Sequence, residues 1–164
     1  MNVATMPSAR PARPARPGRS FLAVFAGLVT VVVLSTAVDA LLHALQVYPP
    51  HGEPMPQHGL NLLALSYRVV ITIVAGALTA KLAPHRSLRS DWRHVWVLGA
   101  IGLALGTIGA ITMIPKNFGP AWYPILLAAS SLPCVWLGGK LVLRERAATT
   151  SGRSPADGAP RVAV

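Results

Sequence analysis

The sequence predicts an all-α integral membrane protein, a four-helix bundle with both termini in the cytoplasm. Three observations predict this fold class. Four stretches of the 164-residue chain are apolar and long enough to cross a bilayer, whose roughly 30 Å core needs about 20 apolar residues in a helix. Charged residues make up only 12% of the chain, about half the fraction typical of a soluble domain. The basic residues gather in every second gap between the apolar stretches.

The expected spans cover residues 21–46, 60–82, 95–114 and 121–141. The first contains one charged residue, Asp39, with His43 one turn later. The second contains Arg68, the third has no charge, and the fourth reaches Lys140 without one. We expect a single membrane domain over residues 20–143, because no other segment is long enough to bury a core of its own.

The two ends of the chain differ in composition from the spans. Residues 1–19 contain three consecutive Ala-Arg-Pro repeats, and a proline at every third position is incompatible with a helix. Residues 144–164 are rich in Ser, Thr, Gly, Pro and Ala, which is typical of disorder. We therefore expect a disordered basic head and a disordered tail. We do not expect the head and the first apolar stretch to form a cleaved secretory signal peptide, because the apolar run is too long and no clean cleavage site follows.

The distribution of Lys and Arg predicts the orientation, because basic residues in short loops mark the cytoplasmic side. Thirteen of them lie before the first span, between the second and third, or after the fourth, if Lys81 and Lys140 at the span ends are counted with these gaps. The other two gaps hold only Lys116. Both termini are therefore expected in the cytoplasm. Trp92 and Trp96 would lie at the inner headgroup level, as amphipathic rings prefer. The outer level would hold Tyr48, Trp122 and Tyr123.

The net charge of +10 lies in tails and short loops beside the spans rather than on a folded surface. We therefore expect attraction to anionic lipid headgroups and no nucleic-acid partner. Cys134 is the only cysteine, so no intramolecular disulfide can form. The chain lacks a phosphate-binding glycine loop, a nucleophile elbow and paired carboxylates, so we predict neither an enzyme nor a bound cofactor.

Two charged side chains fall within the spans. Asp39 lies roughly 9 Å outward of the middle of its span and Arg68 about 4–5 Å outward of the middle of its own. A long arginine side chain can cover this difference, so we predict an Asp39–Arg68 ion pair. His43 and Tyr67 would complete an intramembrane polar cluster. Two interpretations stay open: the pair only fixes helix register, or Asp39 and His43 bind a proton or cation as intramembrane carboxylates do in transporters.

The third span contains four glycines at a spacing that matches the helix repeat. Gly99, Gly102, Gly106 and Gly109 are separated by 3, 4 and 3 residues and therefore lie on one face. Bare backbone lets a neighbouring helix approach closely, so we predict that this stripe packs against small residues of the second or fourth span. The alternative is a cavity lined by backbone.

Proline and glycine also interrupt the fourth span. Pro133 lies in its interior and predicts a helix kink, either a static bend or a hinge. Ser130 is expected to help satisfy the freed backbone. Gly138 and Gly139 are expected to loosen the end of the helix.

The loop between the first two spans contains His51, Glu53, Met55 and His58, which are ligand types for copper or zinc. Their spacing matches no specific ligand pattern, and the loop is rich in proline. We therefore expect a solvated loop and no metal site. Bis-histidine haem is also disfavoured, because His43 is the only histidine within a span.

Several short motifs carry a resemblance: Tyr67-Arg68, Leu82-Ala83-Pro84, Gly119 to Pro124, Leu132-Pro133-Cys134 and Gly138 to Leu141. Over about residues 20–143 the chain resembles a group of small four-span bacterial membrane proteins with no assigned activity. The resemblance implies a stand-alone fold in the bacterial inner membrane and supplies no catalytic or binding residues. The length and span number are also similar to small multidrug transporters, whose carboxylate lies nearer the middle of the first span than Asp39.

These observations favour a non-enzymatic multi-pass membrane protein that acts as a structural or accessory component. Its expected partners are the bilayer and either a second copy of the chain or another membrane protein. The alternative is a small transporter or channel subunit that uses Asp39, His43 and Arg68. A folded Asp39→Asn chain would keep an accessory role but lose proton-coupled transport.

Overall fold

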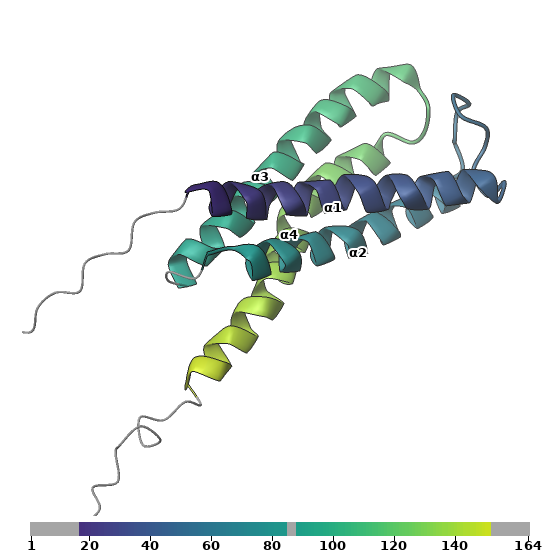
Figure 1. Cartoon of the computed structure of the whole chain (residues 1–164). Coiled ribbons are helices and arrows are strands. Elements are labelled where there is room, and N and C mark those ends of the chain that lie inside the picture. Colours follow the sequence, from purple (N-terminus) through teal and green to yellow (C-terminus); the bar gives the residue numbers. More distant parts are fainter. Residues whose placement is uncertain (1–16, 85–87, 152–164) are drawn as a thin grey trace, which may run out of the picture.

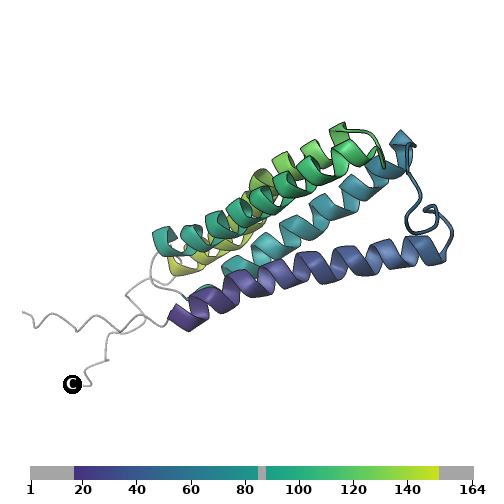
Figure 2. The same cartoon turned by 90° about the horizontal axis from the view of Figure 1, so that it is seen from above.

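The chain folds into four α-helices and one short 3-10 turn in a computed structural model that describes residues 17–84 and 88–151. The elements are α1 (Pro17–Ala44), α2 (His58–Leu82), α3 (Leu88–Met113), η1 (Ile114–Lys116) and α4 (Trp122–Ser151). The helices alternate in direction (Figure 1). One end of the bundle, the loop end, carries residues 45–57 and 114–121. The opposite end, the terminal end, holds the start of α1 and the finish of α4 (Figure 2).

Each predicted span is present as a helix, and each of the four helices is long and apolar enough to cross a membrane. Their bounds differ from the expected ones at the chain ends and at the start of α3, which begins at Leu88 rather than at residue 95. α1 begins at Pro17, within the head that we expected to be disordered, and α4 continues to Ser151, into the expected tail. The remainder of the head and tail lies outside the described residues.

The extra turns of α4 are held by a contact that the amino-acid order does not suggest. The Arg146 guanidinium donates hydrogen bonds to the carbonyl oxygens of Ala80, at 2.9 Å, and Lys81, at 2.8 Å. These carbonyls belong to the last turn of α2, where no intrahelical N–H remains to satisfy them. Arg146 therefore caps α2 from a neighbouring helix and fixes the end of α4 against it.

The closest helix crossing joins α2 to α4. A Cβ atom built on Gly138 would overlap the carbonyl oxygen of Ile73, and one on Gly76 would lie 2.5 Å from the carbonyl oxygen of Val135. Glycine is required at both positions because only hydrogen fits there. The expectation that Gly138 and Gly139 loosen the helix was therefore wrong: Gly138 belongs to the crossing, and a Cβ on Gly139 would crowd Val95 of α3 at 2.8 Å.

Three glycines of the predicted stripe on α3 pack against α4. Cβ atoms on Gly99, Gly102 and Gly106 would lie 2.9, 3.1 and 2.9 Å from atoms of Leu132, Ser131 and Ala128, respectively. Gly109 is different, because a Cβ there would meet no atom within 4 Å. The packing role predicted for Gly109 is therefore not present, since a cavity rather than α4 lies beside this turn of α3.

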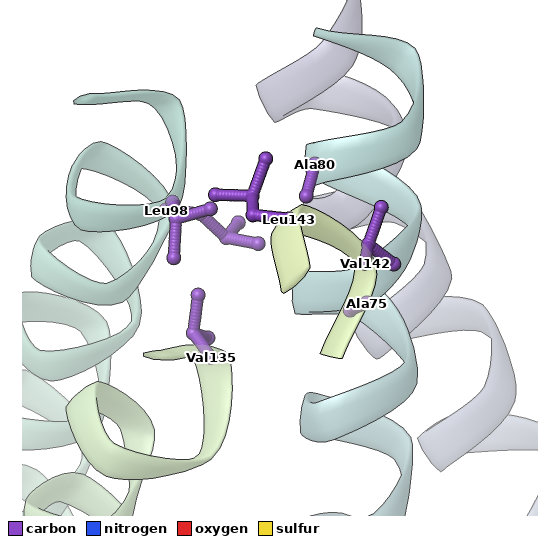
Figure 3. Close-up of a cluster of buried hydrophobic side chains, with 7 residues drawn as sticks. Ala75, Ala80, Leu98, Val135, Val142 and Leu143 are labelled. Carbon is purple, nitrogen blue, oxygen red and sulfur yellow. The ribbon is translucent and has the colours of Figure 1, made fainter. Parts of the chain in front are cut away.

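Small and branched side chains fill the core toward the terminal end. α4 packs extensively against both α2 and α3, while α1 lies mainly along α2. The core cluster comes from α2, α3 and α4 and contains Ala75, Ala80, Val95, Leu98, Val135, Val142 and Leu143 (Figure 3). α1 joins this layer where Gly27 meets the fully buried Thr79 of α2.

α4 runs without interruption across Pro133. The missing proline N–H leaves the carbonyl of Ala129 without its helical partner. Ser130 does not replace that donor as we expected, because its hydroxyl donates instead to the Leu127 carbonyl at 3.0 Å. Pro133 itself lies on the exposed surface of the bundle.

The outer surface of the bundle is apolar. Phe21, Val32, Leu62 and Ile111 are each more than half exposed. Only 11–39% of the residues in the most apolar window of each helix are buried. Contiguous apolar surface of this extent is rare on monomers in water, so the surface is suited to contact with another apolar phase.

We predict that Gly138→Ala destabilises the protein by about 1–3 kcal/mol, because the added methyl group overpacks the α2–α4 crossing. The matched control is Gly109→Ala, also inside a helix, which should be neutral or slightly stabilising because its Cβ meets open space. Thermal unfolding of the purified variants in a mild neutral detergent measures the difference. Equal Tm values for the two variants would contradict the crossing.

Candidate functional site

The polar cluster is built around Asp39 of α1. The Arg68 Nη2 atom of α2 lies 2.5 Å from Asp39 Oδ2 and donates a hydrogen bond to it. The Tyr67 hydroxyl donates to Asp39 Oδ1. Both carboxylate oxygens are therefore occupied by donors from the neighbouring helix. The Arg68 and Asp39 side chains are 23% and 29% exposed, so the pair is shielded from solvent only in part.

Aromatic rings extend the cluster to α4. The Arg68 guanidinium carbon lies 5.6 Å from the centre of the Tyr67 ring and 5.9 Å from that of Tyr123. Both distances are within the range of a cation–π contact. Arg68 thus contacts side chains of α1, α2 and α4.

His43, the fourth residue predicted for the cluster, makes no hydrogen bond to Asp39 within the described chain. Its ring stacks on that of His51 with centroids 3.9 Å apart, and it meets the Tyr48 ring edge-on at 5.5 Å. Its Nδ1 atom is buried, and the described residues provide no hydrogen-bond partner for it. His43 therefore connects the cluster to the loop between α1 and α2.

A cavity of about 720 Å³ occupies the loop end of the bundle. Asp39 and Arg68 line it, and all four helices contribute to its walls. Its polar lining also includes His43, Tyr48, His51, Glu53, Asn61 and Tyr123, while Leu105, Ala110, Met113, Ile114, Phe118 and Leu127 form apolar parts of the wall. A space of this size is typical of a small-molecule site, and its mixed lining suits a molecule with a polar and an apolar part.

Two loops are tied together beside this cavity. The Met55 N–H donates to the Phe118 carbonyl at 2.6 Å. Asn61, only 2% exposed, donates its side-chain amide to the carbonyl oxygens of Met55 and Gln57 at 2.8 and 2.9 Å. Gly119 permits this approach, because a Cβ there would lie 3.1 Å from the Met55 carbonyl oxygen. The loop that follows α1 is therefore fixed to the turn that precedes α4.

Tyr48 closes the cavity from the loop and is 6% exposed. Burial raises the pKa of its phenol above the ordinary value. The Tyr67 hydroxyl and Arg68 act against this shift, and the Asp39 carboxylate adds to it. The hydroxyl therefore keeps its proton at physiological pH and remains available as a donor.

The four loop residues considered as metal ligands have separate contacts. His51 stacks on His43, whereas His58 accepts a hydrogen bond from the Trp122 indole N–H at 2.9 Å. Within residues 17–84 and 88–151, no group of three or more His, Cys, Asp or Glu side chains is arranged to hold a metal ion.

Three residues of the site were not identified from the sequence. Asn61 is a polar residue within an apolar stretch, which is a signal for a buried hydrogen bond. Tyr48 and Tyr123 were interpreted only as interfacial aromatics, because nothing in their spacing indicates a shared cavity. Their hydroxyl oxygens are both buried with no hydrogen-bond partner in the described chain.

The fold and the site define a class of protein: a helical bundle with four candidate membrane-spanning helices and a polar-lined cavity at one end. Comparison with known proteins adds no narrower identity, since no family model, curated protein or solved structure matches the chain.

We predict that Asp39→Asn and Arg68→Gln each lower the free energy of unfolding by about 1–3 kcal/mol, because each leaves an uncompensated group in a partly shielded site. The exchange of both charges, Asp39→Arg with Arg68→Asp, should recover part of the stability that either exchange alone removes. Thermal unfolding in detergent measures this coupling. A double exchange no more stable than the worse single one would show that the two charges do not stabilise each other.

Proposed function

We propose that the chain is a multi-pass protein of the bacterial inner membrane, with both termini in the cytoplasm. The apolar outer surface of all four helices supports insertion, since hydrocarbon favours such a surface and water does not. The distribution of basic residues supports the orientation. Arg19, Lys81, Arg93 and Arg144 belong to the terminal end, whereas Lys116 belongs to the loop end.

We expect topology reporter fusions to place the two ends of the bundle on opposite sides of the membrane. A reporter fused after Tyr48 should be active on the periplasmic side, and one fused after Asp91 on the cytoplasmic side. Alkaline phosphatase and green fluorescent protein fusions provide complementary readouts. If both positions report the same compartment, the proposed topology is wrong.

Within this class, a structural or accessory role has the best support. The observation that carries it is the pairing of Asp39: Arg68 and Tyr67 occupy both of its carboxylate oxygens. An acid held in this way fixes the register of α1 against α2 and does not offer a vacant oxygen to a transported cation. The role is non-enzymatic, and the expected partner is a second copy of the chain or another membrane protein.

The alternative, a small transporter or channel subunit, is favoured by one observation. The cavity reaches Asp39, His43 and Arg68 from the loop end. Toward the terminal end, however, the α2–α4 crossing leaves no room for a side chain at Gly76 or Gly138. Passage between α2 and α4 would therefore require these two helices to separate.

Proton flux separates the two functions. In proteoliposomes under an imposed pH gradient, we expect the wild-type chain to pass no more protons than protein-free vesicles. A transporter would give a flux that disappears in Asp39→Asn protein that is still folded at the temperature of the assay. That result would rule out the accessory role in favour of transport. A stoichiometric protein partner recovered in mild detergent would support the accessory role.

A further inference from the structure

The loop-end cavity contains polar atoms that the protein does not satisfy. Within the described chain, five buried side-chain nitrogen or oxygen atoms have no hydrogen-bond partner. Three of them belong to residues that line this cavity: His43 Nδ1, the Tyr48 hydroxyl and the Tyr123 hydroxyl. Buried polar groups are almost always paired, so these three atoms, in residues that line one space, are the groups of the wall that lack a partner.

The unused hydrogen-bonding capacity consists mainly of donors. The Tyr123 O–H makes no hydrogen bond to the described chain, and the Tyr48 hydroxyl has the Tyr67 hydroxyl nearby but without the geometry of a full hydrogen bond. Arg68 uses one terminal nitrogen for Asp39, and its other N–H groups make no hydrogen bond to a described residue. Asp39 has both oxygens occupied. A ligand that accepts hydrogen bonds therefore fits this lining better than one that donates them.

The free donors, rather than the net charge, favour an oxyanion. Asp39 and Arg68 neutralise each other, so the pair by itself gives little net attraction to a cation or to an anion. An oxyanion would meet guanidinium and phenol donors, and hydrogen bonds to a charged group are the stronger kind. Glu53 also lines the cavity, but its side chain is exposed to solvent, where its charge is screened.

Most of the remaining wall is apolar. Side chains of α3, the turn around η1 and α4 form it, among them Leu105, Met113, Phe118 and Leu127. This surface suits a hydrocarbon body attached to the oxyanion. We propose that the loop-end cavity is a binding site for a small amphiphile whose carboxylate or phosphate head contacts Arg68, Tyr48 and Tyr123. This site requires the folded bundle and does not depend on the accessory role proposed above.

The test is direct binding to the full chain, purified and delipidated in a neutral detergent. Isothermal titration compares decanoate with its neutral and cationic analogues, decanol and decyltrimethylammonium. Native mass spectrometry compares phosphatidylglycerol with phosphatidylcholine. We expect saturable binding of one molecule with an anionic head. Its Kd should be lower than that of the uncharged, cationic or zwitterionic counterpart by about ten-fold or more.

The two arms distinguish the source of the ligand. Selective binding of decanoate alone assigns the site to a soluble amphiphilic acid, and selective binding of phosphatidylglycerol alone assigns it to a lipid headgroup. Binding of neither, or equal binding of the cationic analogue, would overturn the proposal.

Variants locate the binding in the cavity. Tyr48→Phe and Tyr123→Phe each remove an unpartnered hydroxyl but keep the ring, so each should weaken binding about ten-fold without lowering Tm. Gly109→Leu should abolish binding, because Gly109 lines the cavity and its Cβ would meet no atom within 4 Å. Gly59→Leu is the matched control, since Gly59 has equally open space but does not line the cavity. Wild-type affinity in Gly109→Leu would place the ligand elsewhere and sink the proposal.

Discussion

The approach of α2 to α4 at Gly76 and Gly138 is the constraint on which the rest of the bundle depends. In the bilayer proposed for this protein, hydrocarbon would provide little drive for apolar helices to associate, so stability would have to come from close backbone contact and polar bonds. Here the two backbones meet with no intervening side chain. The crossing brings Arg146 within reach of the last carbonyls of α2, and the same half of the bundle contains the buried core of Figure 3.

The two halves of the molecule consequently differ in character. The terminal half is filled by alanine, valine and leucine side chains. The loop half holds the Asp39–Arg68 pair and the large cavity, with Asn61 fixing the α1–α2 loop and Met55 joining that loop to Phe118. A rigid packed half thus supports a half in which polar groups face an open space. Such preorganisation reduces the entropic cost of binding a ligand.

The sequence predicted what depends on local composition and depth. Uniform apolar stretches of about 20 residues define the four helices, and counting residues along them places Asp39 and Arg68 at a similar depth. The cavity could not be foreseen, because it depends on how the helices rotate and on a bond between Met55 and Phe118, which lie far apart in the chain. The role of Gly138 could not be predicted either, since the spacing of glycines does not reveal which helix each of them will face.

α2 packs mainly against α4, from which it is separated along the chain by α3, and this order has a consequence for biosynthesis. α1 and α2 can form their ion pair as soon as both have left the ribosome, because no later segment contributes to it. The face of α2 that carries Gly76, however, waits for α4, which is translated after α3. We expect the α1–α2 hairpin to form early through its ion pair and α4 to pack against α2 later through their close backbone contact. A chain that terminates before α4 would expose the small residues of α2 to quality-control proteases.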